Sequence, residues 1–195
     1  MQLTEAINLV EQWRHTLGIE EALPMFIYSW AYRQTGLYCP ENPYDDHPEF
    51  NRIASALCPA LSTLMMDGYH DPIGDLLTHF NLRQSHSLWL DDGDNILQYD
   101  SPTQGNQTLY DLKMGTGGLL MMHLVQHYKR GTITQLEVVG EEQDSLCCAA
   151  AVLQLIFFTE HISNKYLGDD WPKYIAIRNI HPKAQAPYNY YLKTE

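Results

Sequence analysis

One glycine-rich segment lies between a strand-forming and a helix-forming segment, a context typical of ligand-binding turns. Residues 110–118 read YDLKMGTGG; an apolar segment that favours a strand precedes them, and a helix-forming segment follows. Glycines let the backbone approach a ligand closely, and the free amides at a helix N-terminus attract electronegative groups. This context predicts a nucleoside-binding turn that contains Asp111, Gly115 and Gly117.

A second acidic segment comes where the next strand is expected to end. Residues 140–144 read GEEQD, after the apolar segment 135–140. A carboxylate at the end of a second strand can accept hydrogen bonds from both hydroxyls of a ribose. Glu142 follows Gly118 at close to the spacing of about 20 residues expected for that role. The alternative is an ordinary strand–helix–strand unit whose acidic turn is solvated.

The elements that position these residues alternate between strand and helix after Thr108. Such alternation predicts a parallel sheet covered by helices. We expect strands at 107–110, 135–140 and 174–177, helices at 119–128 and 146–158, and a loop in the C-terminal tail.

The first 82 residues have a helical pattern instead. A helix capped by Thr4 is expected to end at Gly18, and a second helix to have Pro24 near its start. A third spans 49–66 with a kink or break at Pro59, and a short fourth helix runs from Pro72 to Phe80. Residues 83–107 read as a loop with one or two short strands. We therefore expect a helical region, 1–82, before an α/β region, 83–195, in one compact unit.

Three segments, in this order along the chain, resemble the N6-adenine DNA methyltransferases. Residues 71–77 (DPIGDLL) look like the Asp-Pro-Leu-Gly helix that precedes the cofactor domain in modification subunits and phage methylases. Residues 111–118 (DLKMGTGG) resemble the family's Asp-Pro-x-x-Gly-Ser/Thr-Gly-Gly/Ala motif, with Leu and Lys in place of Pro and a small residue. Residues 139–147 (VGEEQDSLC) are similar to its Gly-x-Asp/Glu-Ile-Asp-Pro-Leu-Cys segment.

The resemblance implies a Rossmann-like sheet with helices on both faces and S-adenosylmethionine (SAM) as the cofactor. Gly115 and Gly117 would approach the methionine part of SAM, and Asp111 would hold its ammonium group or an ordering water. Glu142 would hold the ribose, and Asp144 would border the adenine pocket. Carboxylates suit these positions because SAM carries ammonium and sulfonium cations.

The family's catalytic motif, Asn-Pro-Pro-Tyr/Phe, does not occur in the chain. It positions the adenine amino group and stacks the flipped base. The two nearest strings, 179–182 (NIHP) and 186–189 (APYN), have the wrong order. The family's Gly-Gln-Tyr/Phe-Phe-Thr-Pro segment is also missing from residues 83–107. We therefore predict no catalytic residue and a truncated methyltransferase-type region.

Composition narrows the classes of partner. With 24 acidic and 12 basic residues the net charge is −12, which opposes unaided binding to DNA phosphates. Four cysteines without a Cys-x-x-Cys pair, and His123 and His127 without a third ligand, predict no metal site. No apolar stretch is long enough to cross a bilayer and no signal peptide is evident, so we expect a soluble, cytoplasmic protein.

Three functions fit this pattern. The first is a SAM-binding, methyltransferase-like protein without catalysis, acting as a regulator or partner subunit in DNA modification or restriction. The second is an active adenine methyltransferase completed by a partner chain. The third is an acidic interaction protein, such as an anti-restriction factor, that has the fold but no cofactor.

Overall fold

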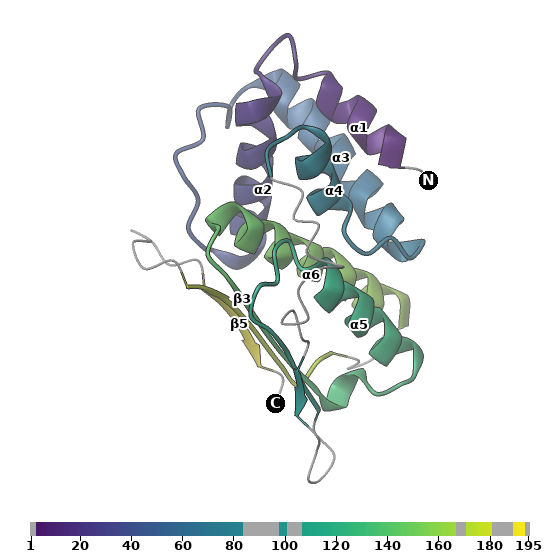
Figure 1. Ribbon diagram of the computed structural model, residues 1–195. Coiled ribbons are helices and arrows are strands. Elements are labelled where there is room, and N and C mark those ends of the chain that lie inside the picture. Colours follow the sequence, from purple (N-terminus) through teal and green to yellow (C-terminus); the bar gives the residue numbers. More distant parts are fainter. Residues whose placement is uncertain (1–2, 84–97, 101–106, 167–170, 181–188, 194–195) are drawn as a thin grey trace.

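The computed structural model describes residues 3–83, 98–100, 107–166, 171–180 and 189–193. Four helices occupy the N-terminal region: α1 (Leu3–Glu11), α2 (Ile19–Thr35), α3 (Pro48–Met66) and α4 (Pro72–His79). They form one end of the molecule, and the sheet forms the other (Figure 1).

The described strands form one mixed sheet in the order β1-β2-β3-β4-β5. They are β1 (Gln98–Asp100), β2 (Gln107–Asp111), β3 (Leu136–Glu142), β4 (Tyr174–Asn179) and β5 (Asn189–Lys193). β2, β3 and β4 are parallel, while β1 and β5 pair antiparallel at the two edges. The α/β class and the three expected strands are confirmed. The tail expected to be a loop instead contains β5.

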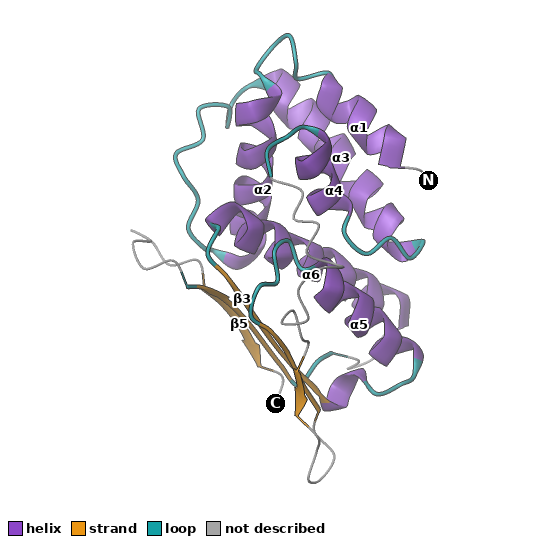
Figure 2. Cartoon of the chain, viewed as in Figure 1, coloured by secondary structure: helices purple, strands orange, loops and turns teal. Residues whose placement is uncertain are grey.

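The described helices cover only one face of this sheet (Figure 2). Helix α5 (Gly118–Lys129) and a 3-10 turn (Ile133–Gln135) connect β2 to β3, and α6 (Ser145–Tyr166) connects β3 to β4. Because each strand pairs with the next and right-handed crossovers are the rule, both connecting helices lie on the same side. The expectation of helices on both faces is wrong for the described residues.

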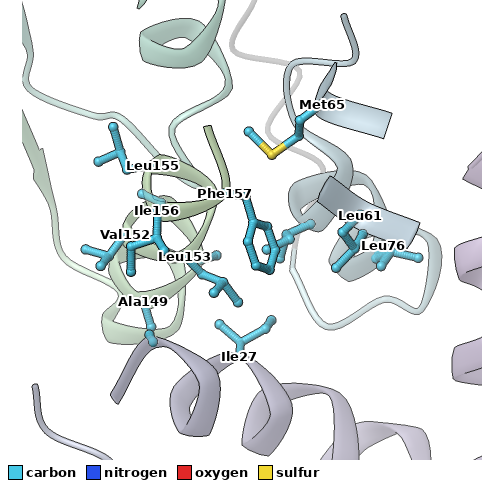
Figure 3. Packing of buried hydrophobic residues seen from close by; sticks show 14 of the residues in the cluster. Ile27, Leu61, Met65, Leu76, Ala149, Val152, Leu153, Leu155, Ile156 and Phe157 are labelled. Atoms are coloured by element: carbon cyan, nitrogen blue, oxygen red, sulfur yellow. The ribbon is translucent and has the colours of Figure 1, made fainter. Parts of the chain in front are cut away.

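Helix α6 lies at the centre of the molecule. Residues 149–155 are all buried, as expected of a helix that is apolar all round. One side of α6 packs on the sheet, and the other meets α2 and α3. Ile27 of α2 and Leu61 of α3 lie beside α6 side chains such as Leu153 and Phe157 (Figure 3). One apolar cluster therefore joins the N-terminal helices to the α/β region.

The N-terminal helices differ in detail from their expected bounds. α1 ends at Glu11 rather than Gly18, and Trp13, in the turns that follow, stacks on Phe50 with ring centroids 5.5 Å apart. Thr4 lies inside α1 and does not cap it. α3 continues through Pro59 without a break.

Candidate functional site

The candidate site lies at the carboxyl edge of β2 and β3. β2 ends at Asp111, β3 ends at Glu142, and α5 begins at Gly118, immediately after the glycine turn of residues 112–117. Since β2 and β3 are parallel neighbours, with Asp111 paired to Gly140, their terminal acids share this edge. The structure therefore brings Asp111 and Glu142 to the same turn.

The Glu142 carboxylate is bound by the backbone of the site itself. Its Oε2 accepts a hydrogen bond from the N–H of Gly115 at 3.0 Å. Its Oε1 accepts from the N–H groups of Gln143 at 2.6 Å and Asp144 at 3.0 Å. Glu142 thus ties the glycine turn to the end of β3, and a ribose hydroxyl would have to share or replace these bonds.

Asp111 and Asp144 are bound more locally. Oδ1 of Asp111 accepts from the N–H of Lys113 at 3.1 Å. Burial raises the pKa of the Asp111 carboxyl, the Lys113 bond lowers it, and the nearby Glu142 charge raises it further, so the net shift is upward. Oδ1 of Asp144 accepts from the N–H groups of Leu146 at 2.7 Å and Cys147 at 3.3 Å, so Asp144 caps the first turn of α6.

The two predicted ligand-contacting glycines have structural neighbours of their own. Gly117 has φ +87°, and a Cβ there would lie 3.1 Å from that of Ala151 on α6. Gly115 has φ +55°, and a Cβ there would lie 3.0 Å from Nη2 of Arg83. Both conformations strongly favour glycine. Backbone geometry and close packing thus account for these glycines without a ligand.

A largely buried polar cluster holds the glycine turn on the side of α4 and α6, and sequence reasoning did not predict it. The Asp71 carboxylate accepts hydrogen bonds from Gly74 N–H at 3.1 Å, Thr116 Oγ1 at 2.7 Å and Gln154 Nε2 at 2.9 Å. Arg83 donates to Thr116 Oγ1 and lies 3.8 Å from the same carboxylate. We call these four side chains, of Asp71, Arg83, Thr116 and Gln154, the Asp71 cluster.

Gln154 connects three elements within this cluster. Besides Asp71, its Nε2 donates to the backbone carbonyl of Thr116 at 2.7 Å, and its Oε1 accepts from the N–H of Ile73 at 3.1 Å. Burial raises the pKa of the Asp71 carboxyl, while the bonds from Thr116 and Gln154 lower it; burial has the larger effect. The cluster joins α4, the glycine turn and α6.

The three segments that carried the family resemblance therefore meet in space. A Cβ on Gly74 would overlap the Asp71 carboxylate, and one on Gly118 would lie 2.8 Å from the Asp71 Cβ.

The sequence did contain a signal for Gln154: it is the only polar residue in the apolar stretch 146–158 of the expected helix.

Two other residues that the sequence singled out, Asn179 and His127, have structural partners. Asn179 ends β4 and its Nδ2 donates to Ser145 Oγ at 2.9 Å, so it links β4 to α6; residues 181–188 lie outside the described part of the chain. His127 lies in the last turn of α5 and is buried, with Nδ1 3.0 Å from Thr132 Oγ1, and burial lowers its pKa. Within the described residues, no group of three potential ligands forms a metal site.

A separate hollow of about 600 Å³ lies in the helical region. It is lined by Arg14, Ile19, Glu20, His79, Phe80, Asn81 and Leu82. None of the predicted ligand residues contributes to it, and it includes no part of the carboxyl edge. We therefore place the candidate site by the strand ends and the turn.

Comparisons of the chain with protein-family models, with curated proteins and with solved structures gave no match. The family resemblance consequently rests on the three sequence segments. Among the described helices, none is both long enough and apolar enough to cross a membrane.

Proposed function

We propose that this protein binds SAM at the carboxyl edge of β2 and β3 without catalysing methyl transfer. In this proposal it acts as a methyltransferase-like regulator or partner subunit in DNA modification or restriction. The observation that carries the proposal is the meeting of Asp111, the glycine turn and Glu142 at the ends of two adjacent parallel strands. Ligands of open α/β sheets bind at this edge.

The chemistry of the edge suits a cationic nucleoside. Asp111 and Glu142 are acidic, and Asp144 lies two residues beyond Glu142 on the same turn. Carboxylates attract the ammonium and sulfonium groups of SAM and accept hydrogen bonds from ribose hydroxyls. Gly115 and Gly117 add no side chain that would hold the ligand away from the backbone.

A cofactor-free interaction protein is the second candidate, and one observation favours it. The Glu142 carboxylate already accepts three backbone N–H bonds, including that of Gly115. The buried side chain of Met114 lies against Gly140, beneath the same edge. The protein's own groups thus fill part of the volume and use some of the donors that a cofactor requires.

A ligand titration separates the two candidates. A molecule that binds only the folded state raises the melting temperature by an amount that grows with its concentration relative to the Kd. We expect SAM and S-adenosylhomocysteine each to raise the melting temperature, and ATP at equal concentration to have no effect. Calorimetric titration up to 1 mM then gives the Kd. No response to either compound would favour the cofactor-free candidate.

A further inference from the structure

The Arg83 guanidinium lies against the glycine turn of the candidate site. A Cβ on Gly115 would lie 3.0 Å from Nη2, 3.5 Å from Cζ and 3.8 Å from Nη1 of this group. Nη1 also donates a hydrogen bond to the hydroxyl of Thr116, the next residue of the turn. The Arg83 side chain is only 16% exposed. The guanidinium is therefore held largely out of water, beside the backbone that the proposed ligand would approach.

Asp71 only partly balances the charge of Arg83. In the described part of the chain it is the acid that pairs with Arg83, with 3.8 Å between Oδ2 and Nη1, which is beyond hydrogen-bond distance. The Thr116 hydroxyl lies between the two groups, since it accepts from Arg83 and donates to Asp71. Burial disfavours the charged form of Asp71 and raises its pKa, whereas a guanidinium stays protonated. A second anion beside Arg83 would therefore offset a largely buried positive charge.

Arg83 lies among acidic residues at the carboxyl edge. Their charges act together on Cys147, in the first turn of α6: burial raises the pKa of its thiol to about 12, three acids raise it further, and Arg83 lowers it. The three acids are Asp144, Glu142 and Asp71. The carboxylate of a bound amino acid would be repelled by these acids and attracted by Arg83.

We propose that Arg83 binds the carboxylate in the amino-acid part of the ligand, so that the site selects a nucleoside that carries an intact amino acid. A guanidinium has five N–H donors in a planar fork, which matches the two oxygens of a carboxylate. Asp111 and Glu142 then take the ammonium and ribose groups, and Arg83 takes the group of opposite charge. The inference rests on the function proposed above and adds a ligand requirement to it.

Calorimetric titration of the full chain with SAM and with decarboxylated SAM tests the proposal. The second compound keeps the nucleoside, sulfonium and ammonium groups and lacks only the carboxylate. An acidic edge without Arg83 would favour it, because its net charge is more positive than that of SAM. We expect the wild type to bind SAM at least about tenfold more tightly, the effect of a hydrogen bond between charged groups.

Three variants locate the partner of the carboxylate. Arg83→Gln should weaken the binding of SAM at least about tenfold and that of decarboxylated SAM by less than about twofold. Arg83→Lys keeps the charge and should retain part of the preference for SAM. Lys113→Gln is the matched control, because it removes the same charge from an exposed side chain of the same turn, and it should bind both compounds as the wild type does. Comparing two ligands on one variant cancels any loss of folded protein, and circular dichroism checks folding.

The outcomes distinguish the role of Arg83 from the function on which it rests. A wild type that binds neither compound would refute both. A wild type that binds SAM no more tightly than decarboxylated SAM would leave the proposed function standing and overturn the role of Arg83. A preference for SAM that Arg83→Gln retains, or that Lys113→Gln removes, would also overturn that role.

Discussion

Two sets of carboxylates lie against the same glycine turn, and their hydrogen-bond partners differ in origin. Asp71 accepts from Thr116 and Gln154, which are 45 and 83 residues away in the sequence. Asp111 and Glu142 accept mostly from backbone within two residues of themselves; the Gly115 bond to Glu142 is the long-range one.

This difference separates the structural role of Asp71 from the ligand-binding role proposed for Asp111 and Glu142. A buried acid whose donors come from three elements fixes those elements relative to one another, and its loss leaves several polar groups unsatisfied. An acid at a strand end can also accept hydrogen bonds from a ligand, which must then share or replace those from its backbone donors. If the proposal holds, carboxylates on the two sides of one turn serve different purposes.

The largest expected effect is on stability, from a substitution in the Asp71 cluster. Gln154→Leu removes the bonds to Asp71, to the Thr116 carbonyl and from Ile73, and leaves the Thr116 carbonyl and the Ile73 N–H without this partner. We expect a loss of about 3–5 kcal/mol in the free energy of unfolding, measured by urea denaturation.

Thr159→Val is the matched control on the same helix, because Thr159 is buried but donates only to the carbonyl of Ile156 within α6. It should cost about 1 kcal/mol or less. Equal losses in the two variants would show that the Asp71 cluster adds nothing special to stability.

Substitutions of the strand-end acids should affect ligand binding more than stability. If SAM binds, Asp111→Ala and Glu142→Ala should each weaken it by about 1–3 kcal/mol, the scale for losing a hydrogen bond to a charged group. Calorimetric titration measures the change. Glu137→Gln, at the other end of β3, is the control and should bind SAM as the wild type does. Unchanged affinity in both alanine variants would refute the assignment of these residues.

Stability should depend on pH through Asp71. Burial raises the pKa of this carboxyl above its ordinary value of 3.8, so the folded state holds the proton more tightly than the unfolded state. That contribution is complete below the ordinary pKa and is lost as pH rises through the folded-state value. Relative to Asp71→Asn, the wild type should therefore lose stability between pH 4 and pH 7. Urea denaturation at both pH values measures it, and a difference that does not change with pH contradicts it.

The smallest expected signal is in methyl transfer, where we predict none. Chemistry on a base requires extracting it from the stack and holding it in a shaped pocket, and the chain has no Asn-Pro-Pro-aromatic segment to do so. The test incubates purified protein with unmethylated genomic DNA and labelled SAM, beside a known adenine methylase. Transfer that Gly115→Trp abolishes would instead make this protein an active enzyme.

Sequence patterns predicted the local units of the fold well. The strands that end at Asp111 and Glu142 and the helix after the glycine turn follow from apolar periodicity and glycine placement, which are short-range signals. β5 was missed because a short tyrosine-rich segment becomes a strand only when β4 offers an edge to pair with.

The partners of Asp71 needed tertiary structure. Its helix-capping bond from Gly74 is local and fits the pattern at residues 71–74. Nothing along the chain pairs Asp71 with Gln154, because helix periodicity places Gln154 in an apolar run without saying what it faces. The hydrogen bond from the Gly115 N–H to the Glu142 carboxylate could not be predicted from the sequence for the same reason.

The central position of α6 has a consequence for the order of folding. The N-terminal helices are synthesised first, yet α2 and α3 bury their apolar sides against a helix that begins at Ser145. During synthesis, Ile27 and Leu61 cannot contact α6 until the chain has been made beyond Ser145. Contacts this distant close late and slow folding. The apolar sides of α2 and α3 that face α6 can therefore complete their packing only after the residues of α6 have been made.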